Sequence, residues 1–564
     1  MPWSDKGGNK FAMMNYPLLL RSVLYRAATV FPEKEIVSRD YSQTVRYTYA
    51  DMHRRVCQLA NALNALGVQR GEHVASFAWN HHRHLELYFA VPCSQRVLHT
   101  VNIRLFRDQI VYTINHAEDK ALFVDEDLVP LIESMVSELK TVQHYIIMTD
   151  KRGTPTTSLP GAVYYEDFIA GQPETYEFPE FDEWTPAILS YTSATTGNPK
   201  GVLYTHRGLY LHCLTSLTGE LGTREYDVTM PVVPMFHVNA WGRPYCDTWM
   251  GAKQVYPGSR PTAKDLCELI HTERVSFAVG VPTIWMGVLQ HVRAHPQQYD
   301  FSCVRFLMSG GAAMPASLTQ AFERELGVRL WQGYGQTETT PVTFVNEPKS
   351  SLSHLSEDER LKLRTKTGLI MPGLEMRVVG EDGREVAHDG KQMGELWLRG
   401  PWVLAEYYKD ADQTEQSFVD GWFRTGDIVT LDEHGYLQIV DRTKDLIKSG
   451  GEWISSVDLE NTIMAHPLVA EAAVIGIPHE KWQERPLACV VPAQGAEGRV
   501  TKADILEFLR AKVAKWWLPD DVVFVREIPK TSVGKFAKKT LRQWYQEGKL
   551  VASTAPELSG ESHA

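Results

Sequence analysis

Segments with the apolar spacing of a helix alternate with short apolar runs typical of strands over most of the chain. In residues 48–66 the apolar side chains recur at steps of four and three, which predicts a helix that ends before Gly67. A strand-like run follows at residues 73–79, and similar runs recur at residues 120–124, 142–148, 275–281 and 304–308. Because strands separated by helices form parallel sheets with helices on their faces, this order predicts an α/β fold of largely parallel, helix-covered sheets.

The pattern changes near residue 441, where a charged stretch and a Gly-Gly pair precede a smaller α+β pattern. Thr501 is expected to cap a helix that extends to about residue 517, among strand-like runs at residues 472–477, 487–491 and 522–525. We therefore predict a large N-terminal domain and a small, mobile α+β C-terminal domain, over residues 1–441 and 442–550, with a hinge at 441–445. The small and polar residues 551–564 are predicted to be disordered.

The composition excludes several classes of protein. The chain has 58 Lys and Arg residues against 69 Asp and Glu, and its net charge of −11 disfavours binding to nucleic acid. Its seven cysteines are odd in number and include no C-x-x-C pair, so neither a disulfide framework nor a cysteine zinc site is expected. No stretch reaches the roughly 18 uninterrupted apolar residues of a membrane span. These features predict a soluble, cytoplasmic protein with no integral membrane segment.

The most informative segment is YTSATTGNPKG at residues 191–201, which lies between two apolar runs. Its hydroxyls, its backbone N–H groups and Lys200 can all bind phosphate oxygens. The segment is not a Walker loop, because Lys200 is followed by Gly201 rather than by Ser or Thr. For this loop taken alone, a Ser/Thr-rich surface turn is the alternative.

Three further segments carry residues suited to a nucleotide. GYGQTE at residues 333–338 ends in Glu338 instead of the last Gly of the dinucleotide fingerprint, and a carboxylate there suits a hard cation. GWFRTGD at residues 421–427 places Asp427 after a tight turn, where a carboxylate can accept both hydroxyls of a ribose. PKTSVGKF at residues 529–536 offers Lys535 as a mobile positive charge for a phosphate.

Taken together, the chain resembles the adenylate-forming superfamily, which includes acyl-CoA synthetases, firefly luciferase and peptide-synthetase adenylation domains. The resemblance covers residues 47–542 and is carried by YTSATTGNPKG, GYGQTE, GWFRTGD, DRTKDLIKSGGEWISSVDLE and PKTSVGK in this order. VVPMFHVNAWG at residues 232–242, with KSGGEWISSVDLE, looks most like the medium- to long-chain fatty acyl-CoA synthetases. The resemblance implies the adenylate-forming enzyme fold and an acyl-CoA ligase that uses ATP, Mg²⁺ and CoA. A carboxylic acid and Mg-ATP would give an acyl-adenylate and pyrophosphate, and CoA would then displace AMP to give the thioester.

The same resemblance implies roles for individual residues. Lys535 matches the lysine that bridges the acyl carboxylate and the α-phosphate, Thr337 a phosphate contact, and Glu338 the magnesium ligand. The pyrophosphate loop would consist of Thr192, Ser193, Thr195, Thr196, Gly197 and Lys200. The adenylate would be bound by Gly311, Ala312, Ala313, Gly333, Tyr334, Gly335 and Gln336, by Asp427 and Arg442 at the ribose, and by Trp453 near the adenine.

For the second step, the resemblance implies that the small domain rotates about Lys444, so that Lys535 leaves and CoA enters. The path of CoA would then be lined by Lys448, Gly450 and Gly451. His237 would lie with the catalytic groups where the acyl and CoA channels meet, and Trp241 and Gly310 would gate a fatty-acyl tunnel. From its apolar strand alone, His237 is more often a satisfied core histidine than an acid or base. The resemblance further implies a homodimer through the N-terminal domain, with Trp3, Phe11, Met13 and Met14 as candidate contacts.

Two residues depart from the family pattern. Ala194 stands where the loop usually has Gly, and a Cβ at a position that needs positive φ would cost about 1 kcal/mol and weaken ATP or pyrophosphate handling. Arg243 follows the gate, where an apolar residue would suit a fatty tail; it either points outward or selects a carboxylate or phosphate.

The match around the gate favours an aliphatic acid of medium to long chain. Short thioether, branched or aryl acids remain alternatives, as does transfer to a carrier-protein thiol. A nucleotide-binding but poorly catalytic homologue is the alternative from a different class, which Ala194 alone suggests.

Overall fold

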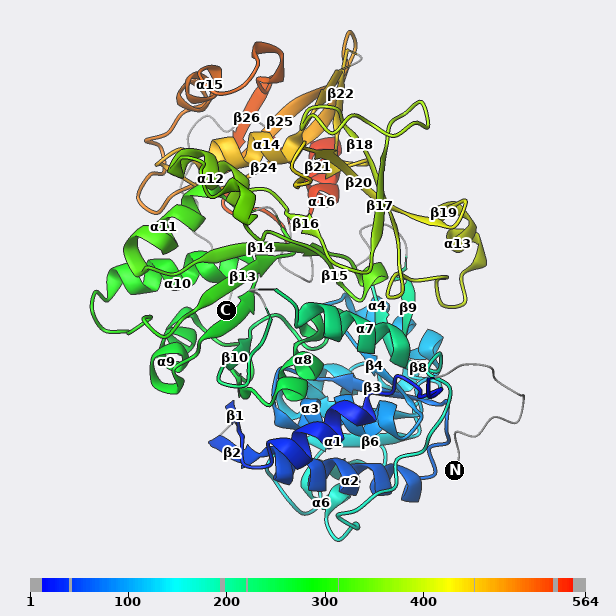
Figure 1. The fold of residues 1–564 in the computed structure, drawn as a ribbon. Coiled ribbons are helices and arrows are strands. Elements are labelled where there is room, and N and C mark those ends of the chain that lie inside the picture. The colour runs from blue at the N-terminus through cyan, green and yellow to red at the C-terminus, as the bar shows by residue number, and fades with distance from the viewer. Residues whose placement is uncertain are drawn as a thin grey trace.

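The computed structural model describes residues 13–39, 43–192, 198–219, 222–312, 314–450, 452–530 and 536–550, and its strands form four β-sheets. Figure 1 shows a seven-stranded sheet at the bottom, a nine-stranded sheet in the middle, and two smaller sheets towards the top. The predicted tail at residues 551–564 lies outside the described residues.

The seven-stranded sheet is parallel except at one edge, where β8 and β9 pair antiparallel. Its order is β7 (Val163–Tyr164), β6 (His144–Met148), β5 (Ala121–Asp125), β3 (His73–Phe77), β4 (Val97–Thr100), β8 (Pro186–Tyr191) and β9 (Gly201–Thr205). The helices of this part are α1 (Arg21–Val30), α2 (Tyr49–Ala65), α3 (His82–Cys93), α4 (Arg107–Ala117), α5 (Val129–Glu133) and α6 (Tyr165–Ile169).

Helix α2 forms where the apolar spacing predicts it. A reciprocal pair of hydrogen bonds between Thr48 and Asp51 caps its first turn, which satisfies backbone donors that a helix start leaves free. The predicted apolar face is buried and packs into the largest core cluster, through Met52, Val56, Leu59 and Leu63.

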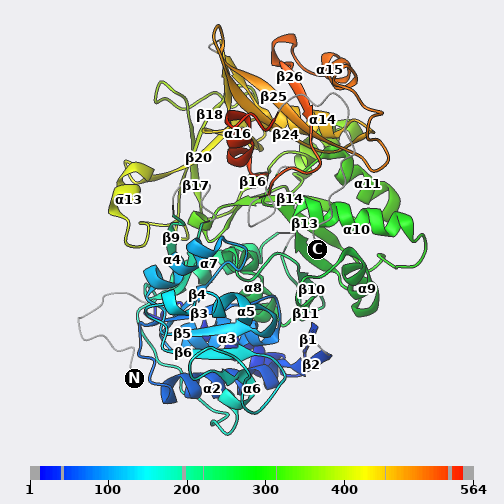
Figure 2. The ribbon, with the colours of Figure 1, turned by 180° about the vertical axis from the view of Figure 1, so that it is seen from behind.

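The nine-stranded sheet has a parallel centre and antiparallel edges. Its order is β16 (Leu369–Ile370), β15 (Val342–Val345), β14 (Leu330–Gly335), β13 (Phe306–Gly310), β12 (Phe277–Gly280), β10 (Val228–Pro231), β11 (Lys253–Tyr256), β1 (Glu35–Arg39) and β2 (Thr44–Thr48). In both Figure 1 and Figure 2, α9 (Ala263–Glu273), α10 (Pro282–Ala294) and α11 (Ala316–Leu326) lie together along one side of this sheet. The other helices of this part are α7 (His206–Ser216), α8 (Arg243–Met250) and α12 (Glu357–Arg364). The predicted α/β architecture with helix-covered, largely parallel sheets is therefore confirmed for the two large sheets.

The third sheet differs from the prediction because all its strands pair antiparallel. It consists of β17 (Glu375–Val379), β18 (Gly394–Arg399), β20 (Trp422–Leu431) and β19 (Phe418–Val419), and β21 (Leu437–Arg442) also pairs with β20. Only the short helix α13 (Ala411–Ser417) intervenes in this part of the chain, so no long crossover helix is available to align neighbouring strands in parallel.

The fourth sheet belongs to the C-terminal part of the chain. It consists of β23 (Glu452–Ile454), β22 (Ile447–Ser449), β25 (Gln483–Pro492), β24 (Val469–His479) and β26 (Asp521–Phe524), accompanied by α14 (Ser456–Met464), α15 (Lys502–Arg510) and α16 (Lys538–Gln546). Thr501 caps α15 as predicted. The prediction that this helix continues to residue 517 is wrong, because the chain leaves it after Arg510 and turns back to bring β26 beside β25.

The predicted hinge at 441–445 lies between the third and fourth sheets, since β21 ends at Arg442 and β22 begins at Ile447. Among the described residues, none of the helices combines the length and the apolar character that a bilayer crossing requires.

Candidate active site

A cavity of about 190 Å³ lies where the carboxyl ends of β8, β13 and β14 meet the third sheet. In sheets with parallel strands this edge is where ligands bind. Most of the described residues that the sequence assigns to nucleotide, catalysis or gate line it: Thr192, His237, Trp241, Gly311, Gly333, Tyr334, Gly335, Gln336, Thr337, Glu338 and Arg442. A wider cavity of about 450 Å³ adjoins it and is lined by Lys200, Lys444, Tyr407 and Glu338.

The polar end of the cavity is organised by Asp427, which is 3% exposed. Its Oδ2 accepts hydrogen bonds from the Tyr334 hydroxyl and from Gln336 Nε2, the latter at 2.6 Å. Its Oδ1 lies 3.1 Å from Arg442 Nε. The negative charge of Asp427 raises the pKa of Arg442, while burial and then Asp427 raise the pKa of Tyr334, so the phenol stays protonated and donates. A buried carboxylate with a cation and two donors is held in one orientation.

Glu338 and the preceding Thr337 are held by residues from two other segments of the chain. The Tyr407 hydroxyl donates to its Oε1 over 2.9 Å, and the Leu404 N–H donates to its carbonyl over 2.8 Å. The Tyr204 hydroxyl donates to the carbonyl of the preceding Thr337 over 2.7 Å. Lys200 Nζ lies 5.2 Å from the centroid of the Tyr407 ring, so the same tyrosine contacts the carboxylate and the loop lysine.

The loop predicted to bind phosphate is closed at its base. The Thr192 N–H donates to the Lys200 carbonyl over 2.9 Å, and the Lys200 N–H donates to Thr192 Oγ1 over 3.1 Å. Burial lowers the pKa of Lys200, and Glu338 opposes this shift. The structure does not describe the central residues of this loop, which are Ser193, Ala194, Thr195, Thr196 and Gly197. Ala313, Gly451 and Lys535 lie outside the described residues as well.

Trp241 stands between the cavity at Asp427 and a second, mostly apolar cavity of about 240 Å³. It belongs to a turn in which Val238, Asn239, Ala240 and Trp241 all have φ between 41° and 59°. Left-handed backbone costs roughly 1–2 kcal/mol per non-glycine residue, so this turn is strained and is kept by the burial around it. Gly310 leaves room for the indole, because a Cβ there would lie 2.8 Å from Trp241 Cη2.

The apolar cavity is lined mainly by aliphatic, aromatic and Met side chains, including Phe277, Val279, Met308, Val342, Leu369, Ile370 and Met371. Arg243 also lines it but is buried, and its Nε donates to Asp247 Oδ1 over 3.1 Å. Its guanidinium carbon lies 4.8 Å above the Phe277 ring. Burial favours the neutral form of Arg243, but Asp247 raises its pKa, so the guanidinium stays charged. Both expectations for Arg243 are therefore wrong: it neither points outward nor offers a free charge, because Asp247 neutralises it inside the fold.

Several predicted residues lie elsewhere. Lys448 and Trp453 line a different groove, with Lys448 Nζ 4.1 Å from the centroid of the Trp453 ring. A Cβ at Gly450 would meet the ring of Trp482. Ala312 is exposed next to Gly311.

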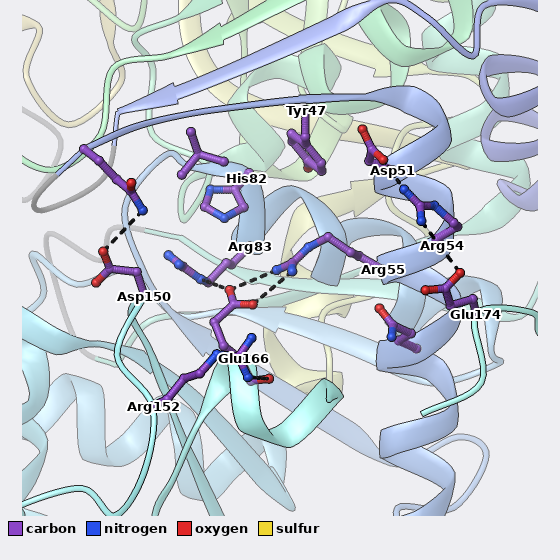
Figure 3. A pocket seen from close by; sticks show the side chains of 13 residues that line it. Tyr47, Asp51, Arg54, Arg55, His82, Arg83, Asp150, Arg152, Glu166 and Glu174 are labelled. Atoms are coloured by element: carbon purple, nitrogen blue, oxygen red, sulfur yellow. Dashed lines mark hydrogen bonds and ion pairs between the residues drawn. The ribbon is translucent and has the colours of Figure 1, made fainter. Parts of the chain in front are cut away.

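A separate charged cavity of about 450 Å³ lies beside α2 and α6 (Figure 3). Its arginines face carboxylates rather than open space. Arg55 donates to Glu166 with both guanidinium NH groups, Arg83 donates to the same carboxylate over 2.9 Å, and Arg54 lies 3.7 Å from Glu174. These mutual ion pairs give the cavity no surplus charge for a ligand.

The sequence did not single out Tyr407, Tyr204 or Arg104, all of which contact or line the site. The two tyrosines carry no motif, and Tyr204 reads as part of an apolar strand. Only the packing of segments distant in sequence brings Tyr407 to Glu338 and Tyr204 to Thr337.

Comparison with known proteins identifies matches over nearly the whole chain. The model of the AMP-binding enzyme family matches residues 24–408, and that of the AMP-binding enzyme C-terminal domain matches residues 458–535. A long-chain-fatty-acid–CoA ligase of Thermus thermophilus is 49% identical over 538 residues, which cover 95% of this chain and 97% of that protein. A 3-methylmercaptopropionyl-CoA ligase of Ruegeria lacuscaerulensis is 43% identical over 537 residues, which cover 95% of this chain and 98% of that protein. A crystal structure of an anthranilate CoA ligase with anthranoyl-AMP superposes with a TM-score of 0.83 at 26% identity, covering 95% of this chain and 99% of that one.

The role of Asp427 can be tested with Asp427→Asn. The amide keeps the size of the side chain but removes the charged acceptor, so we expect the affinity for AMP to fall about tenfold or more, the usual loss for a charge-assisted hydrogen bond. Calorimetric titration with AMP measures it. Asp420→Asn, the same change at an exposed position in the preceding turn, should leave the affinity unchanged. Equal affinities in the two variants would contradict the assignment.

Proposed function

This chain belongs to the AMP-binding enzyme family, and we propose that within it the chain acts as an ATP-dependent acyl-CoA ligase. The observation that carries the proposal is the junction at Trp241. On one side, Asp427, Glu338 and Arg442 suit a nucleotide and its phosphates; on the other, an apolar cavity suits the tail of an acid. A carboxylic acid lying across this junction would present its carboxylate to the α-phosphate of ATP.

In the first step of the proposed reaction, a carboxylate oxygen forms a bond to the α-phosphorus and the bond to pyrophosphate breaks. Charge on the phosphates must be balanced as the reacting atoms are brought into line. Lys200 is available for the outer phosphates in the wider cavity, and Arg442 and Asp427 would hold the ribose. Lys535 is the proposed bridge between the acid and the α-phosphate, on the resemblance of its motif.

Glu338 suits the magnesium ion that accompanies ATP. Mg²⁺ usually takes one or two carboxylates together with substrate phosphates, rather than a cage of protein ligands. Glu338 supplies one carboxylate; Tyr407 holds its Oε1, and Glu338 lines the same cavity as Lys200. When bound, the ion would neutralise negative charge on the phosphates.

In the second step, the CoA sulfur attacks the acyl carbonyl, a carbon–sulfur bond forms, and AMP leaves with the carboxylate oxygen. This requires Lys535 to withdraw and a path for the thiol to open. We propose that the C-terminal part of the chain moves about Lys444. This residue lies in the chain between the third and fourth sheets and lines the wider cavity. The hairpin of β22 and β23, with Lys448 and Gly450, would then approach the acyl group. Domain movement of this kind is a common way to run two reactions in one site.

The acid is proposed to be aliphatic and of medium to long chain. The apolar lining beyond Trp241 supports an apolar tail, and the internal pairing of Arg243 removes the charge that would have favoured an anionic tail. The Thermus thermophilus relative is named for long-chain fatty acids and the Ruegeria lacuscaerulensis relative for 3-methylmercaptopropionate, so a short thioether acid is the second candidate.

Acid-dependent release of pyrophosphate from Mg-ATP tests the function directly. We expect release that peaks at one chain length across a series from acetate to palmitate, with acyl-CoA and AMP formed once CoA is added. The series includes 3-methylmercaptopropionate and benzoate, and maximal release with either would move the assignment to a short thioether or aryl acid. ATP binding without release from any acid would instead support the nucleotide-binding, poorly catalytic alternative.

Tyr407→Phe tests how Glu338 is positioned. The change keeps the ring against Lys200 but removes the hydrogen bond to Oε1. Partners of this kind usually change metal affinity by roughly 10–100-fold, so we expect the Mg²⁺ concentration for half-maximal pyrophosphate release to rise about tenfold. Binding of Mn²⁺ in the presence of ATP, followed by electron paramagnetic resonance, should weaken in parallel.

Tyr408→Phe is the matched control for this experiment. Tyr408 is the next residue and has the same side chain, but its ring lies 5.4 Å from that of His116. It should bind Mn²⁺ like the unchanged protein. Unaltered metal dependence in Tyr407→Phe would show that the hydrogen bond does not position Glu338.

A further inference from the structure

Arg104 occupies an unusual place in the catalytic cavity. It lies in the connection between β4 and α4, at the carboxyl edge of the seven-stranded sheet, and lines the same cavity as Thr192, His237 and Glu338. It does not line the adjoining cavity that holds Lys200, Tyr407 and Lys444. The guanidinium therefore shares a cavity with the junction at Trp241 and does not line the one that holds Lys200.

No carboxylate pairs with Arg104 in the described part of the chain. Its guanidinium carbon lies 5.6 Å from the centroid of the Phe236 ring, and Phe236 itself is buried. Burial lowers the pKa of Arg104, and no acidic group offsets this effect. Two other arginines that line these cavities are paired: the buried Arg243 with Asp247, and Arg442 with Asp427.

Arg104 is exposed, so water solvates its charge, and an anion that enters the cavity can replace this water with paired hydrogen bonds. The guanidinium is planar and matches carboxylates and phosphates with two parallel hydrogen bonds. Among the reactants of the proposed ligase, the triphosphate of ATP has Lys200 in the other cavity and, through Mg²⁺, Glu338, which lines both cavities. The remaining anions are the carboxylate of the acid and the phosphates of CoA.

We propose that Arg104 is a substrate-binding residue that receives an oxyanion of the acid or of CoA beside Phe236 and His237. This proposal rests on the proposed ligase function, and both sources present the same chemistry to the guanidinium. They differ in the step they affect. A carboxylate would be bound before adenylation, whereas a CoA phosphate would be bound only for thioester formation.

The test uses Arg104→Met, which keeps much of the stem that covers Phe236 but removes the charge, and Arg104→Lys, which keeps the charge but not the planar fork. Arg107→Met is the matched control, because Arg107 lies three residues further on, is exposed, and is paired with Glu138. Pyrophosphate release without CoA gives KM for the acid and for ATP. Thioester formation gives KM for CoA and for pantetheine, which lacks the phosphates.

We expect Arg104→Met to raise one KM about tenfold or more, the loss typical of a charge-assisted hydrogen bond, with an intermediate value for Arg104→Lys. A raised KM for the acid without CoA identifies the carboxylate. A raised KM for CoA that disappears with pantetheine identifies a CoA phosphate. In either case KM for ATP should stay within about twofold of the unchanged protein, and Arg107→Met should change none of these values.

The proposal is overturned if Arg104→Met leaves KM for both acid and CoA within twofold, or if KM for ATP rises as much as the others. Calorimetric binding of octanoate and of CoA to the same variants provides a readout that needs no turnover. If the unchanged protein releases no pyrophosphate with any acid, the ligase function fails. In that case weaker binding of octanoate or CoA to Arg104→Met would still support the oxyanion site, and equal binding would refute it.

Discussion

The carboxylate of Asp427 joins two sheets of different construction, and the geometry of the cavity depends on that junction. Asp427 lies on β20 of the antiparallel third sheet, while Tyr334 and Gln336, which donate to it, belong to β14 and the turn after it in the nine-stranded sheet. Arg442 faces it across the pairing of β20 with β21. A buried carboxylate is stable only with such partners, so the two sheets meet in the one relative position that satisfies it. The edge of β14, which carries the residues next to Glu338, is thereby fixed against the wall of the third sheet.

The second constraint is the separation of the polar cavity from the apolar one by Trp241, with Met308 and Val342, which line both cavities. Trp241 lies in a turn of left-handed residues, and its neighbours Val238, Asn239 and Ala240 are buried. Strain of this kind persists only where the surrounding packing determines the backbone, and it is found mainly at sites that bind or switch. Directly after the turn, Arg243 lines the apolar cavity, but its charge is paired with the buried Asp247. The lining beyond Trp241 is therefore mainly apolar, with Glu347 as the other charged side chain that contributes to it.

The sequence predicted those parts of the site whose residues lie close together along the chain. Tyr334, Gln336 and Glu338 lie at alternate positions of a strand and the turn after it, so a short sequence motif is enough to recognise them. The fold then places this motif at the edge of the sheet. Tyr407 and Tyr204 reach Glu338 and Thr337 from segments more than 60 residues away in sequence, and nothing local marks them. The alternation of strands and helices predicted the two parallel sheets, whereas the antiparallel third sheet depends on short connections that the same pattern does not distinguish. The early end of α15 has a similar cause, because tertiary pairing of β26 with β25 overrides a helical pattern that continues in the sequence.

The boundary between the third and fourth sheets also has the physical character that a movable C-terminal part would need. The core clusters of the fourth sheet and its helices include no residue of the clusters formed by the other three sheets. Polar contacts cross the boundary instead: Ser455 Oγ donates to the Val440 carbonyl over 2.6 Å, the Ser456 N–H donates to Asp441 over 2.8 Å, and Lys448 lies 3.8 Å from Glu381. Hydrogen bonds to a charged group contribute about 1.5–3 kcal/mol and exposed ion pairs about 1 kcal/mol or less, so opening this boundary would cost polar contacts, including one to the buried Asp441, rather than hydrophobic core. A rotation about Lys444 would thus exchange one set of polar contacts for another. The two arrangements could then have similar free energies, as two states that interconvert must.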